Sequence, residues 1–372
     1  MRDLKDIRLD INKVDDELKK LFLQRMEYIE QVREYKAATN TPVKNKSREA
    51  DILKSKLEGV EKYVAETSEF FKSMIEISCN YQDECLSTLK YDVVFRNIDE
   101  KDFFNNIKTV CHQGIVGSYS YEVAEKYFGN KKIISVENFK DVFENVVNGV
   151  CDIGVLPFEN LCQGSVDEVY DLMKKYDVIV THNVDLPINH CLAGIGNREN
   201  VETVMSHPQA LGQCSEYIAK NGYVKKEVIN TAVAAQKVSD YKDDSVAAIC
   251  SNLAAEKFGL KVLDCDIANI KSNKTKFIFI TKDNVKVEGA DKVSILFTLP
   301  HEAGTLSRIL NDFAKNDINM TKIESRPSDD GEWEYVFYID IELPELDICD
   351  YFSRKRYMFE DFKILGIHKT LE

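Results

Sequence analysis

Two cationic side chains near the start of the chain, Arg25 and Lys36, have the type and spacing of an anion-binding site. Apolar residues recur before them at helical intervals of three and four, at Leu4, Ile7, Ile11, Val14, Leu18 and Leu21. Continuing that repeat puts Arg25 on the apolar face, and Lys36 lies roughly 20° further around the helix. Like charges on one inward face repel each other unless an anion neutralises them. The pair therefore indicates a bound anion, with side chains reaching outward from a frayed helix end as the alternative.

The stretch 273–280, "NKTKFIFI", places the hydroxyl of Thr275 between Lys274 and Lys276. The four apolar residues after Lys276 predict a strand that is buried on both faces. A hydroxyl flanked by cations at the end of a buried strand is a candidate for work on an anionic ligand. The sequence alone does not separate this interpretation from an ordinary polar strand end, where threonine is common.

Three more polar clusters stand where short apolar runs end, at residues 114–120 ("GIVGSYS"), 157–160 ("PFEN") and 206–214 ("SHPQALGQC"). Glycines between a strand and a helix free backbone N–H groups to face an anion at the start of the helix. The last two clusters offer the side chains of Asn160, Ser206, His207 and Gln213. Each cluster alone is also compatible with simple helix capping, but three in one unit favour a shared site.

The composition excludes several classes of function. The 372 residues are 44% hydrophobic and 30% charged, as in soluble multidomain proteins, and the net charge of −14 argues against a nucleic-acid partner. The six histidines show no metal-ligand spacing, and the ten cysteines form no Cys-x-x-Cys pair, which predicts free thiols in a reducing compartment. The start "MRDLKDIRLD" contains no apolar signal region, and no apolar run has membrane-spanning length. We therefore expect a cytoplasmic protein.

The elements that must position Arg25 and Lys36 are helices. Neither Pro nor Gly interrupts the chain before Pro42, so the repeat predicts one helix of roughly 36 residues, about 54 Å long. Two further helices are expected at 46–65 and 68–88, which makes residues 1–90 an all-α domain. One short domain cannot cover so long an apolar face, so we expect a homodimer or a higher homo-oligomer.

The clusters around Thr275 belong to a different architecture. Residues 91–106 are charged and unpatterned and are expected to be a linker. From 107 to 283 short apolar runs alternate with helical patterns, which predicts α/β structure with a parallel sheet. The alternation restarts near residue 188, which indicates two lobes with a ligand cleft between them.

The last part of the chain, residues 290–372, changes pattern again. Strands are expected at 292–299, 318–327, 332–341 and 362–369, and helices at 304–317 and 344–358. Residues 328–331, "SDDG", are expected to form a turn between the second and third strands. The order βαββαβ predicts a small α+β sandwich.

The helical segment resembles the all-α chorismate mutase domain through its cationic and polar positions, Arg8, Arg25, Lys36, Arg48, Glu49, Ser78 and Gln82. The resemblance implies that arginines clamp the two carboxylates of chorismate, with Arg8 supplied by the partner chain. It also implies that Lys36 and Gln82 donate to the breaking ether oxygen and that Glu49 holds the ring hydroxyl. Asn45 departs from the Asp of many relatives.

The span 107–283 resembles prephenate dehydratase through "GSYS", "PFEN", "INHCLAGIG", "SHPQALGQC" and the triplet 275–277. The resemblance implies that Thr275 acts on the departing hydroxyl, and that the substrate is held by Asn160, Ser206, His207 and Gln213. Lys276 stands where the family usually has Arg, "GIVG" lacks the usual proline, and "ENLCQG" replaces Thr-Ser-Ser-Gly. These departures put the efficiency of the dehydratase in question more than its fold.

The segment 290–372 resembles an ACT domain, with motifs that imply binding of phenylalanine by Gly304, Thr305, Leu306, Glu324, Ser325 and Arg326. The N–H groups at 304–306 would receive the carboxylate, and 324–326 would face it across a dimer interface.

Together the three resemblances match the bifunctional chorismate mutase–prephenate dehydratase family. They imply conversion of chorismate to prephenate and then to phenylpyruvate, phenylalanine as inhibitor, and neither metal nor organic cofactor. Two alternatives remain: a mutase with an impaired dehydratase, and a non-catalytic phenylalanine sensor.

Overall fold

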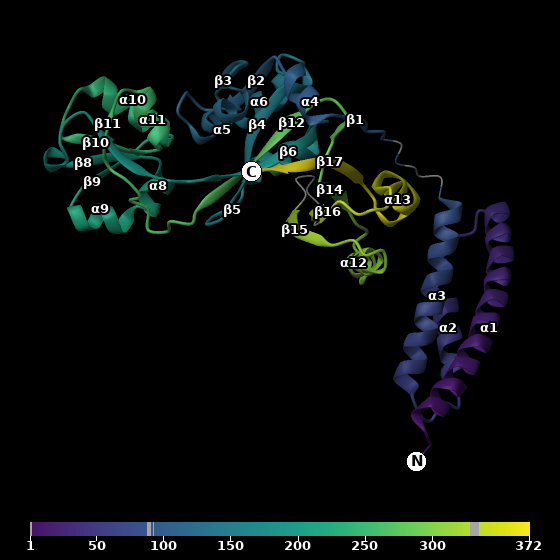
Figure 1. The fold of residues 1–372 in the computed structure, drawn as a ribbon. Coiled ribbons are helices and arrows are strands. Elements are labelled where there is room, and N and C mark those ends of the chain that lie inside the picture. Colours follow the sequence, from purple (N-terminus) through teal and green to yellow (C-terminus); the bar gives the residue numbers. More distant parts are fainter. Residues whose placement is uncertain (1, 88–90, 92, 328–334) are drawn as a thin grey trace. The chain divides into compact units, whose positions relative to one another are not determined.

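A computed structural model of the chain describes residues 2–87, 91, 93–327 and 335–372. The chain divides into two compact units (Figure 1). The first contains Met1–Asp92 with Asp347–Phe359, and the second contains Val93–Leu346 with Glu360–Glu372.

The N-terminal segment is helical, as predicted, with α1 (Leu4–Thr39), α2 (Lys46–Leu57) and α3 (Val64–Leu86). The expected length of α1 is confirmed at 36 residues. Asp3 caps its start by accepting from the Lys5 N–H, and Asn40 ends it in the left-handed conformation. The second helix is shorter than the expected 46–65, because the backbone turns away after Leu57 and passes through Gly59 at φ 76°.

The apolar stripe of α1 stays open to solvent in the single chain. No side chain of α1 is buried, and Leu18 and Leu21 remain 44% and 61% exposed. A contiguous apolar stripe of this length is unusual on a monomer.

The expected linker at 91–106 is only partly correct. Residues within it form β1 (Arg96–Ile98) and α4 (Glu100–Asn106), and β1 pairs in parallel with β13 (Val285–Val287). Asp99 caps α4 by accepting from the Asp102 N–H at 3.1 Å, while Phe103 turns inward and is buried. Most residues of this short helix are charged or polar, so its one buried residue, Phe103, does not produce a recognisable helical pattern in the sequence.

The first lobe is built on a mixed sheet with strand order β3-β2-β4-β12-β6. The strands are β2 (Thr109–Gln113), β3 (Lys132–Val136), β4 (Ile153–Asn160), β6 (Ile179–Pro187) and β12 (Lys274–Thr281), with the short β5 (Gly164–Ser165) beside β4. The helices are α5 (Tyr119–Phe128), α6 (Phe139–Val147) and α7 (Asp167–Lys175). Within this lobe the expected parallel pairing is correct only for β2, β3 and β4, because β12 is antiparallel to both of its neighbours.

The second lobe carries a five-stranded sheet with the order β11-β7-β10-β8-β9. Its strands are β7 (Cys191–Gly194), β8 (Thr203–Ser206), β9 (Val224–Glu227), β10 (Val246–Cys250) and β11 (Lys261–Asp264). Its helices are η1 (Arg198–Asn200), α8 (Pro208–Gln213), α9 (Ser215–Asn221), α10 (Thr231–Tyr241) and α11 (Asn252–Lys257). Helices α10 and α11 lie on one side of the sheet and α9 on the other (Figure 1). Buried alanines let α10 and α11 pack closely on the strands.

The C-terminal segment contains β14 (Lys292–Thr298), α12 (Thr305–Lys315), β15 (Met320–Pro327), β16 (Tyr335–Glu342), α13 (Ile348–Lys355), η2 (Arg356–Met358) and β17 (Phe362–Leu371). Its strands follow the order β15-β16-β14-β17, all antiparallel. The end of β17 pairs in parallel with β6, so this sheet continues into the first lobe. The expected turn at 328–331 lies outside the described residues.

Candidate functional site

A cavity of about 520 Å³ lies between the two lobes of the α/β segment. The first lobe contributes Ser118, Asn160 and Thr275 to its wall, and the second contributes His207 and Gln213. The polar clusters that the sequence singled out at strand ends are thus brought to one cavity. The position between lobes is where α/β proteins of this kind bind small molecules.

Thr275 and Asn160 form the centre of this site. They are direct cross-strand neighbours on β12 and β4, and the Asn160 Nδ2 donates to the Thr275 Oγ1 at 2.9 Å. The Asn160 Oδ1 accepts from the Cys162 N–H at 3.0 Å, which sets the orientation of the amide. The two side chains are only 7% and 8% exposed. Because the hydroxyl accepts from the amide, its own proton is available for a ligand in the cavity.

The cations beside Thr275 do not belong to the cavity. Lys276 does not line it, and its Nζ lies 3.9 Å from the Glu159 Oε2 instead. Successive side chains of a strand point to opposite faces, so Thr275 and Phe277 face the cavity while Lys276 faces away. Among the described residues that line the cavity, none is Lys, Arg, Asp or Glu.

Backbone N–H groups supply the positive potential that the lining side chains lack. Ser118 caps the start of α5 through a 3.2 Å bond from the Tyr121 N–H, and Asn230 caps α10 through a 2.8 Å bond from the Val233 N–H. Both caps line the cavity, so the positive ends of two helices point toward it.

A hydrogen-bonded row of side chains along the wall was not predicted from the sequence. His190 connects the Tyr119 hydroxyl, 3.1 Å from Nδ1, to the Gln213 Oε1, 2.8 Å from Nε2. Burial lowers the pKa of His190, so the ring is neutral and its Nε2–H donates to Gln213. That bond leaves the amide N–H groups of Gln213 available to a ligand. The signal was present in "INHCLAGIG", where His190 directly precedes a buried strand.

The other two predicted residues of the second lobe differ in placement. His207 lines the cavity and caps α8, accepting from the Gln209 N–H at 3.3 Å. Ser206 is fully buried at the end of β8, and its hydroxyl donates to the Ile249 carbonyl at 2.6 Å. Ser206 is therefore placed to hold the β8–α8 turn, one residue away from the wall.

In the helical unit, Arg25, Ser78 and Gln82 come together between α1 and α3. The Arg25 guanidinium donates to the Ser78 hydroxyl and, at 3.4 Å, to the Met74 carbonyl. Ser78 and Gln82 are buried, and the Gln82 Nε2 donates to the Ser78 carbonyl at 2.9 Å. The Gln82 Oε1 is buried without a hydrogen-bond partner.

The remaining predicted mutase residues surround this group to different degrees. The Lys36 Nζ donates to the Val43 carbonyl at 2.6 Å, and Glu49 accepts from the Asn45 N–H at 3.1 Å. Burial raises the pKa of the Cys79 thiol, and the charge of Glu49 raises this pKa further, while the charge of Lys36 lowers it. Glu49 and Lys36 therefore both lie near this part of α3. Arg48 sits in the first turn of α2 and Arg8 is exposed on α1. Arg8 is about 26 Å from Arg25 along the helix, too far for one pocket.

The predicted regulatory residues fall into two places. A cavity of about 290 Å³ beside the start of α12 is lined by Thr305 and Leu306, directly after Gly304 at φ 88°. Glu324, Ser325 and Arg326 do not line this cavity. Arg326 instead forms ion pairs with Asp167 and, at 3.2 Å, with Asp171 on α7.

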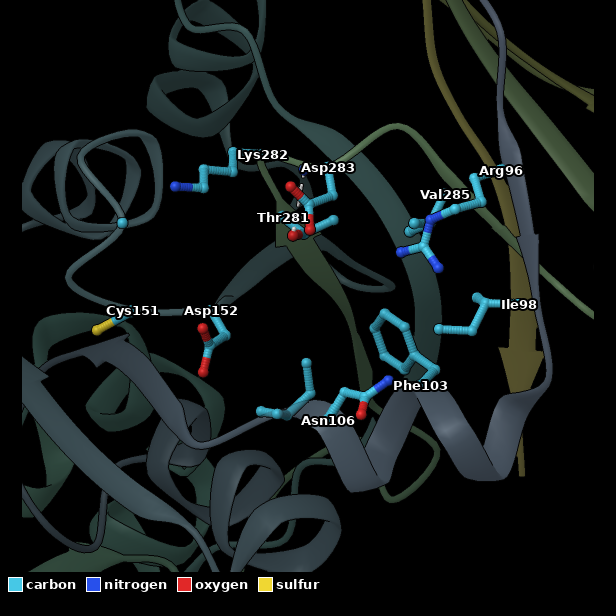
Figure 2. Close-up of a pocket in the computed structure, with 12 residues that line it drawn as sticks. Arg96, Ile98, Phe103, Asn106, Cys151, Asp152, Thr281, Lys282, Asp283 and Val285 are labelled. Carbon is cyan, nitrogen blue, oxygen red and sulfur yellow. Dashed lines mark hydrogen bonds between the residues drawn. The ribbon is translucent and has the colours of Figure 1, made fainter.

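A smaller cavity of about 140 Å³, lined by Arg96, Asp152, Lys282 and Asp283 among others, contains no predicted site residue (Figure 2). Asp152 is committed to the N–H groups of Lys108 and Thr109 at 2.8 and 2.9 Å. Across the described residues no group of three or more His, Cys, Asp or Glu side chains could hold a metal ion. Within the same residues, no helix combines the length and apolarity needed to cross a membrane.

Profiles of three families match the chain in succession. Chorismate mutase type II matches residues 7–83, Prephenate dehydratase matches residues 110–285, and the ACT domain matches residues 293–345. Fold and sites therefore define a helical mutase, a two-lobed dehydratase and an ACT domain on one chain.

Relatives carry the same names. A bifunctional chorismate mutase/prephenate dehydratase of Aquifex aeolicus is 32% identical, covering 92% of this chain and 90% of its own. A prephenate dehydratase of Methanocaldococcus jannaschii is 42% identical, covering 71% of this chain and 95% of its own. The structure of the Staphylococcus aureus prephenate dehydratase matches with a TM-score of 0.61 and 26% identity, over 70% of this chain and 99% of that one. The chain belongs to the bifunctional chorismate mutase/prephenate dehydratases.

Proposed function

We propose that the chain rearranges chorismate to prephenate in its helical unit and converts prephenate to phenylpyruvate in the cavity between the α/β lobes. The observation that carries this function is the Thr275 hydroxyl, which is buried, held by Asn160 at 2.9 Å and placed on the wall of the cavity. Family membership supports both activities.

The first reaction needs no covalent chemistry from the protein. Chorismate is a dianion, and the enzyme must hold both carboxylates while charge grows on the breaking ether oxygen. Arg25 and Arg48 clamp the carboxylates, together with Arg8 of a second copy of the chain. Lys36 and Gln82 donate to the ether oxygen, Glu49 holds the ring hydroxyl, and Ser78 orients Arg25.

The second reaction breaks two bonds of prephenate and makes its ring aromatic. The electron pair of the breaking bond to the ring carboxylate enters the ring as carbon dioxide leaves, and the ring expels the hydroxyl group. Thr275 hydrogen-bonds to that departing oxygen, which leaves as water once it gains a proton. Carboxylates are held by the N–H groups of α5 and α10, by His207 and by the free amide of Gln213. Ser206 contributes by holding the turn that carries His207.

The position of Lys276 favours an active dehydratase over an impaired one. Lys276 stands where the family usually has Arg, but its side chain points away from the cavity and toward Glu159. Exchange of one cation for the other therefore leaves the wall of the cavity unchanged.

Phenylalanine is the proposed inhibitor, bound by the βαββαβ ACT domain. Its carboxylate meets the N–H groups of Gly304, Thr305 and Leu306, where the cavity at the start of α12 lies. The segment 324–326 of a second copy closes the site, which makes binding depend on a homodimer or larger oligomer. The ten free thiols suit the reducing conditions of the cytoplasm.

One experiment tests the function. The purified chain is given prephenate, without and with phenylalanine, and phenylpyruvate is measured; chorismate consumption is measured in parallel. Phenylpyruvate formation that phenylalanine suppresses supports the whole proposal. Chorismate consumption without phenylpyruvate would reduce the protein to a mutase, and phenylalanine binding without either reaction would make it a sensor.

A further inference from the structure

Strand β15 of the ACT domain directs the polar side chains of one of its faces toward the dehydratase lobe. Lys322, Glu324 and Arg326 share a face of this strand, because side chains alternate along it, and this face is less exposed than the other. Arg326 reaches Asp171 on α7, and Lys322 reaches the end of β4.

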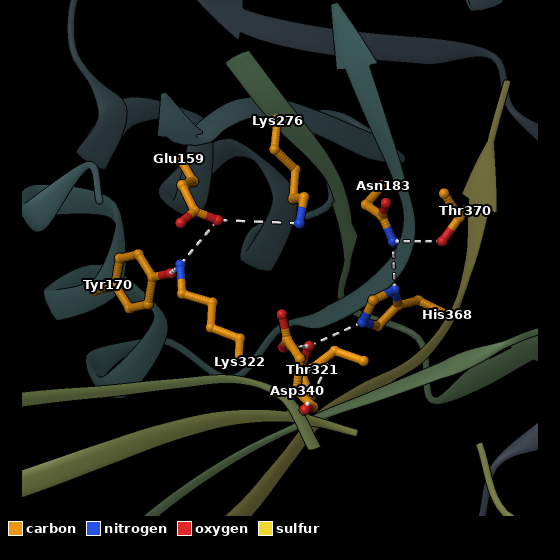
Figure 3. Close-up of polar contacts among 10 residues, drawn as sticks. Glu159, Tyr170, Asn183, Lys276, Thr321, Lys322, Asp340, His368 and Thr370 are labelled. Carbon is orange, nitrogen blue, oxygen red and sulfur yellow. Dashed lines mark hydrogen bonds and ion pairs between the residues drawn. The ribbon is translucent and has the colours of Figure 1, made fainter. Parts of the chain in front are cut away.

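Lys322 is held at the dehydratase lobe by several contacts (Figure 3). Its Nζ lies 3.0 Å from the Glu159 Oε2 and 2.7 Å from the Tyr170 hydroxyl. The ammonium also lies over the rings of Phe158 and Tyr170, at 5.5 and 5.2 Å from their centroids. The Lys322 side chain is 14% exposed and the Glu159 side chain 33%, so this ion pair is partly shielded from solvent.

Glu159 connects Lys322 to the pair formed by Asn160 and Thr275. It directly precedes Asn160 on β4, and it lies opposite Lys276 in the same register that places Asn160 opposite Thr275. A bulge between Lys276 and Phe277 separates these two residue pairs from the regular part of the sheet. Beyond the bulge β4 is also paired with β5 and β12 with β6, and the Glu159 carboxylate shared by Lys322 and Lys276 adds a side-chain contact at this end of β4.

We propose that Lys322, a residue of the ACT domain, is a positioning residue for the dehydratase reaction. By holding Glu159 it keeps the end of β4 in place, and thereby keeps the Asn160 amide on the Thr275 hydroxyl. The inference rests on the proposed function. Because 324–326 lies on the same strand, phenylalanine bound there acts on the dehydratase by displacing Lys322 from Glu159.

Loss of Lys322 has a defined physical effect. Glu159 then keeps only the pair with Lys276 at 3.9 Å, which is at the limit of an ion pair and is more exposed. The carboxylate turns outward, and the strand end beyond the bulge gains freedom. A displacement of about 1 Å at the reacting groups is enough to lower a rate by about a hundredfold. The cavity wall remains, so substrate binding changes less than turnover.

The test compares Lys322→Met with Lys363→Met in the full chain. Lys363 on β17 also reaches from the ACT domain to the dehydratase lobe, at 2.7 Å from the Tyr176 carbonyl and 3.3 Å from Asp177, and these two polar contacts involve neither β4 nor β12. Chorismate mutase activity of each variant reports the concentration of folded protein. We expect Lys322→Met to lower the dehydratase kcat about tenfold with little change in KM. Lys322→Arg restores most of the kcat, and Lys363→Met leaves it within about twofold.

Two outcomes would overturn the positioning role. The first is a dehydratase kcat of Lys322→Met within about twofold of the wild-type value. The second is an equal loss of kcat in Lys363→Met, which would show a general effect of the contact between the domains. Both are distinct from failure of the proposed function, in which the wild-type chain itself would form no phenylpyruvate.

Inhibition by phenylalanine tests the regulatory half of the inference. Lys322→Met is expected to bind phenylalanine in calorimetry at least as tightly as wild type, because no ion pair has to be broken, while its residual dehydratase activity responds at least about threefold less to saturating phenylalanine. If phenylalanine lowered the dehydratase activity of Lys322→Met and of wild type by the same factor, at equal occupancy of the phenylalanine site, the inhibition would not act through Lys322.

Discussion

At the scale of single residues, the proposed dehydratase chemistry depends on the Thr275 hydroxyl. Replacing Thr275 by Ala removes the group proposed to meet the departing oxygen and leaves the Asn160 amide to donate to the Lys274 carbonyl, at 3.3 Å. We expect the dehydratase kcat to fall by about a hundredfold or more, the usual contribution of a positioned proton donor. Mutase activity is expected to remain at the wild-type level, because none of the proposed mutase residues changes.

Thr275→Ser is the matched control for that substitution. It keeps the hydroxyl and loses only a methyl group, so most of the dehydratase activity should survive. Phenylpyruvate formation is measured for both variants against their own chorismate consumption. Undiminished dehydration in Thr275→Ala would exclude the role assigned to this hydroxyl.

At the scale of secondary-structure elements, the junction of β6 and β17 predicts a dependence of stability on pH. His368 on β17 is buried, with Nδ1 2.9 Å from the Asn183 Nδ2 and Nε2 2.8 Å from the Ser294 hydroxyl. Burial lowers the pKa of His368 to about 4 and that of the neighbouring buried His182 to about 3, against an ordinary value of 6.5. Both rings are therefore neutral in the folded protein at neutral pH.

The sign of the effect follows from the bound protons. Between pH 6.5 and pH 4 the unfolded chain binds more protons than the folded one, so the free energy of unfolding falls as the pH falls. Each of the two histidines contributes up to about 1.4 kcal/mol per pH unit in this window. Urea unfolding followed by circular dichroism between pH 7 and pH 5.5 measures the slope before most carboxylates titrate. His368→Asn should reduce the slope, and an unchanged slope would mean that this ring titrates normally.

At the scale of the whole molecule, the exposed stripe of α1 and the distant Arg8 predict active sites shared between chains. In a dimer of one Arg8→Ala chain and one Arg25→Ala chain, one site keeps both arginines and the other loses both. Each homodimer lacks one arginine in every site and should be nearly inactive as a mutase. Chains that pair at random after co-expression should therefore recover about one quarter of the wild-type mutase activity.

Chorismate consumption by the two single variants and by their mixed population decides this prediction. Dehydratase activity serves as the control, because both arginines lie in the helical unit and outside the dehydratase cavity. A mixed population no more active than its parents would show that Arg8 serves the site of its own chain.

Several features of this protein were determined by the sequence alone because they depend on neighbours in the chain. The uninterrupted repeat before Pro42 predicted the full length of α1, and the apolar run after Lys276 predicted the central strand β12. Short motifs predicted that Thr275, Asn160, His207 and Gln213 belong to one site, and all four line the cavity. The linker prediction was only partly correct, because α4 buries one aromatic residue among charges.

Only the tertiary structure decided which of these groups meet. Asn160 and Thr275 lie 115 residues apart and are joined by the register of β4 and β12. The same register, with its bulge, turns Lys276 toward Glu159 and away from the cavity. Strand β15 brings Lys322 to that carboxylate from the next domain. Such contacts depend on strand register and on sheet continuity across domains, and no local pattern of residue types contains that information.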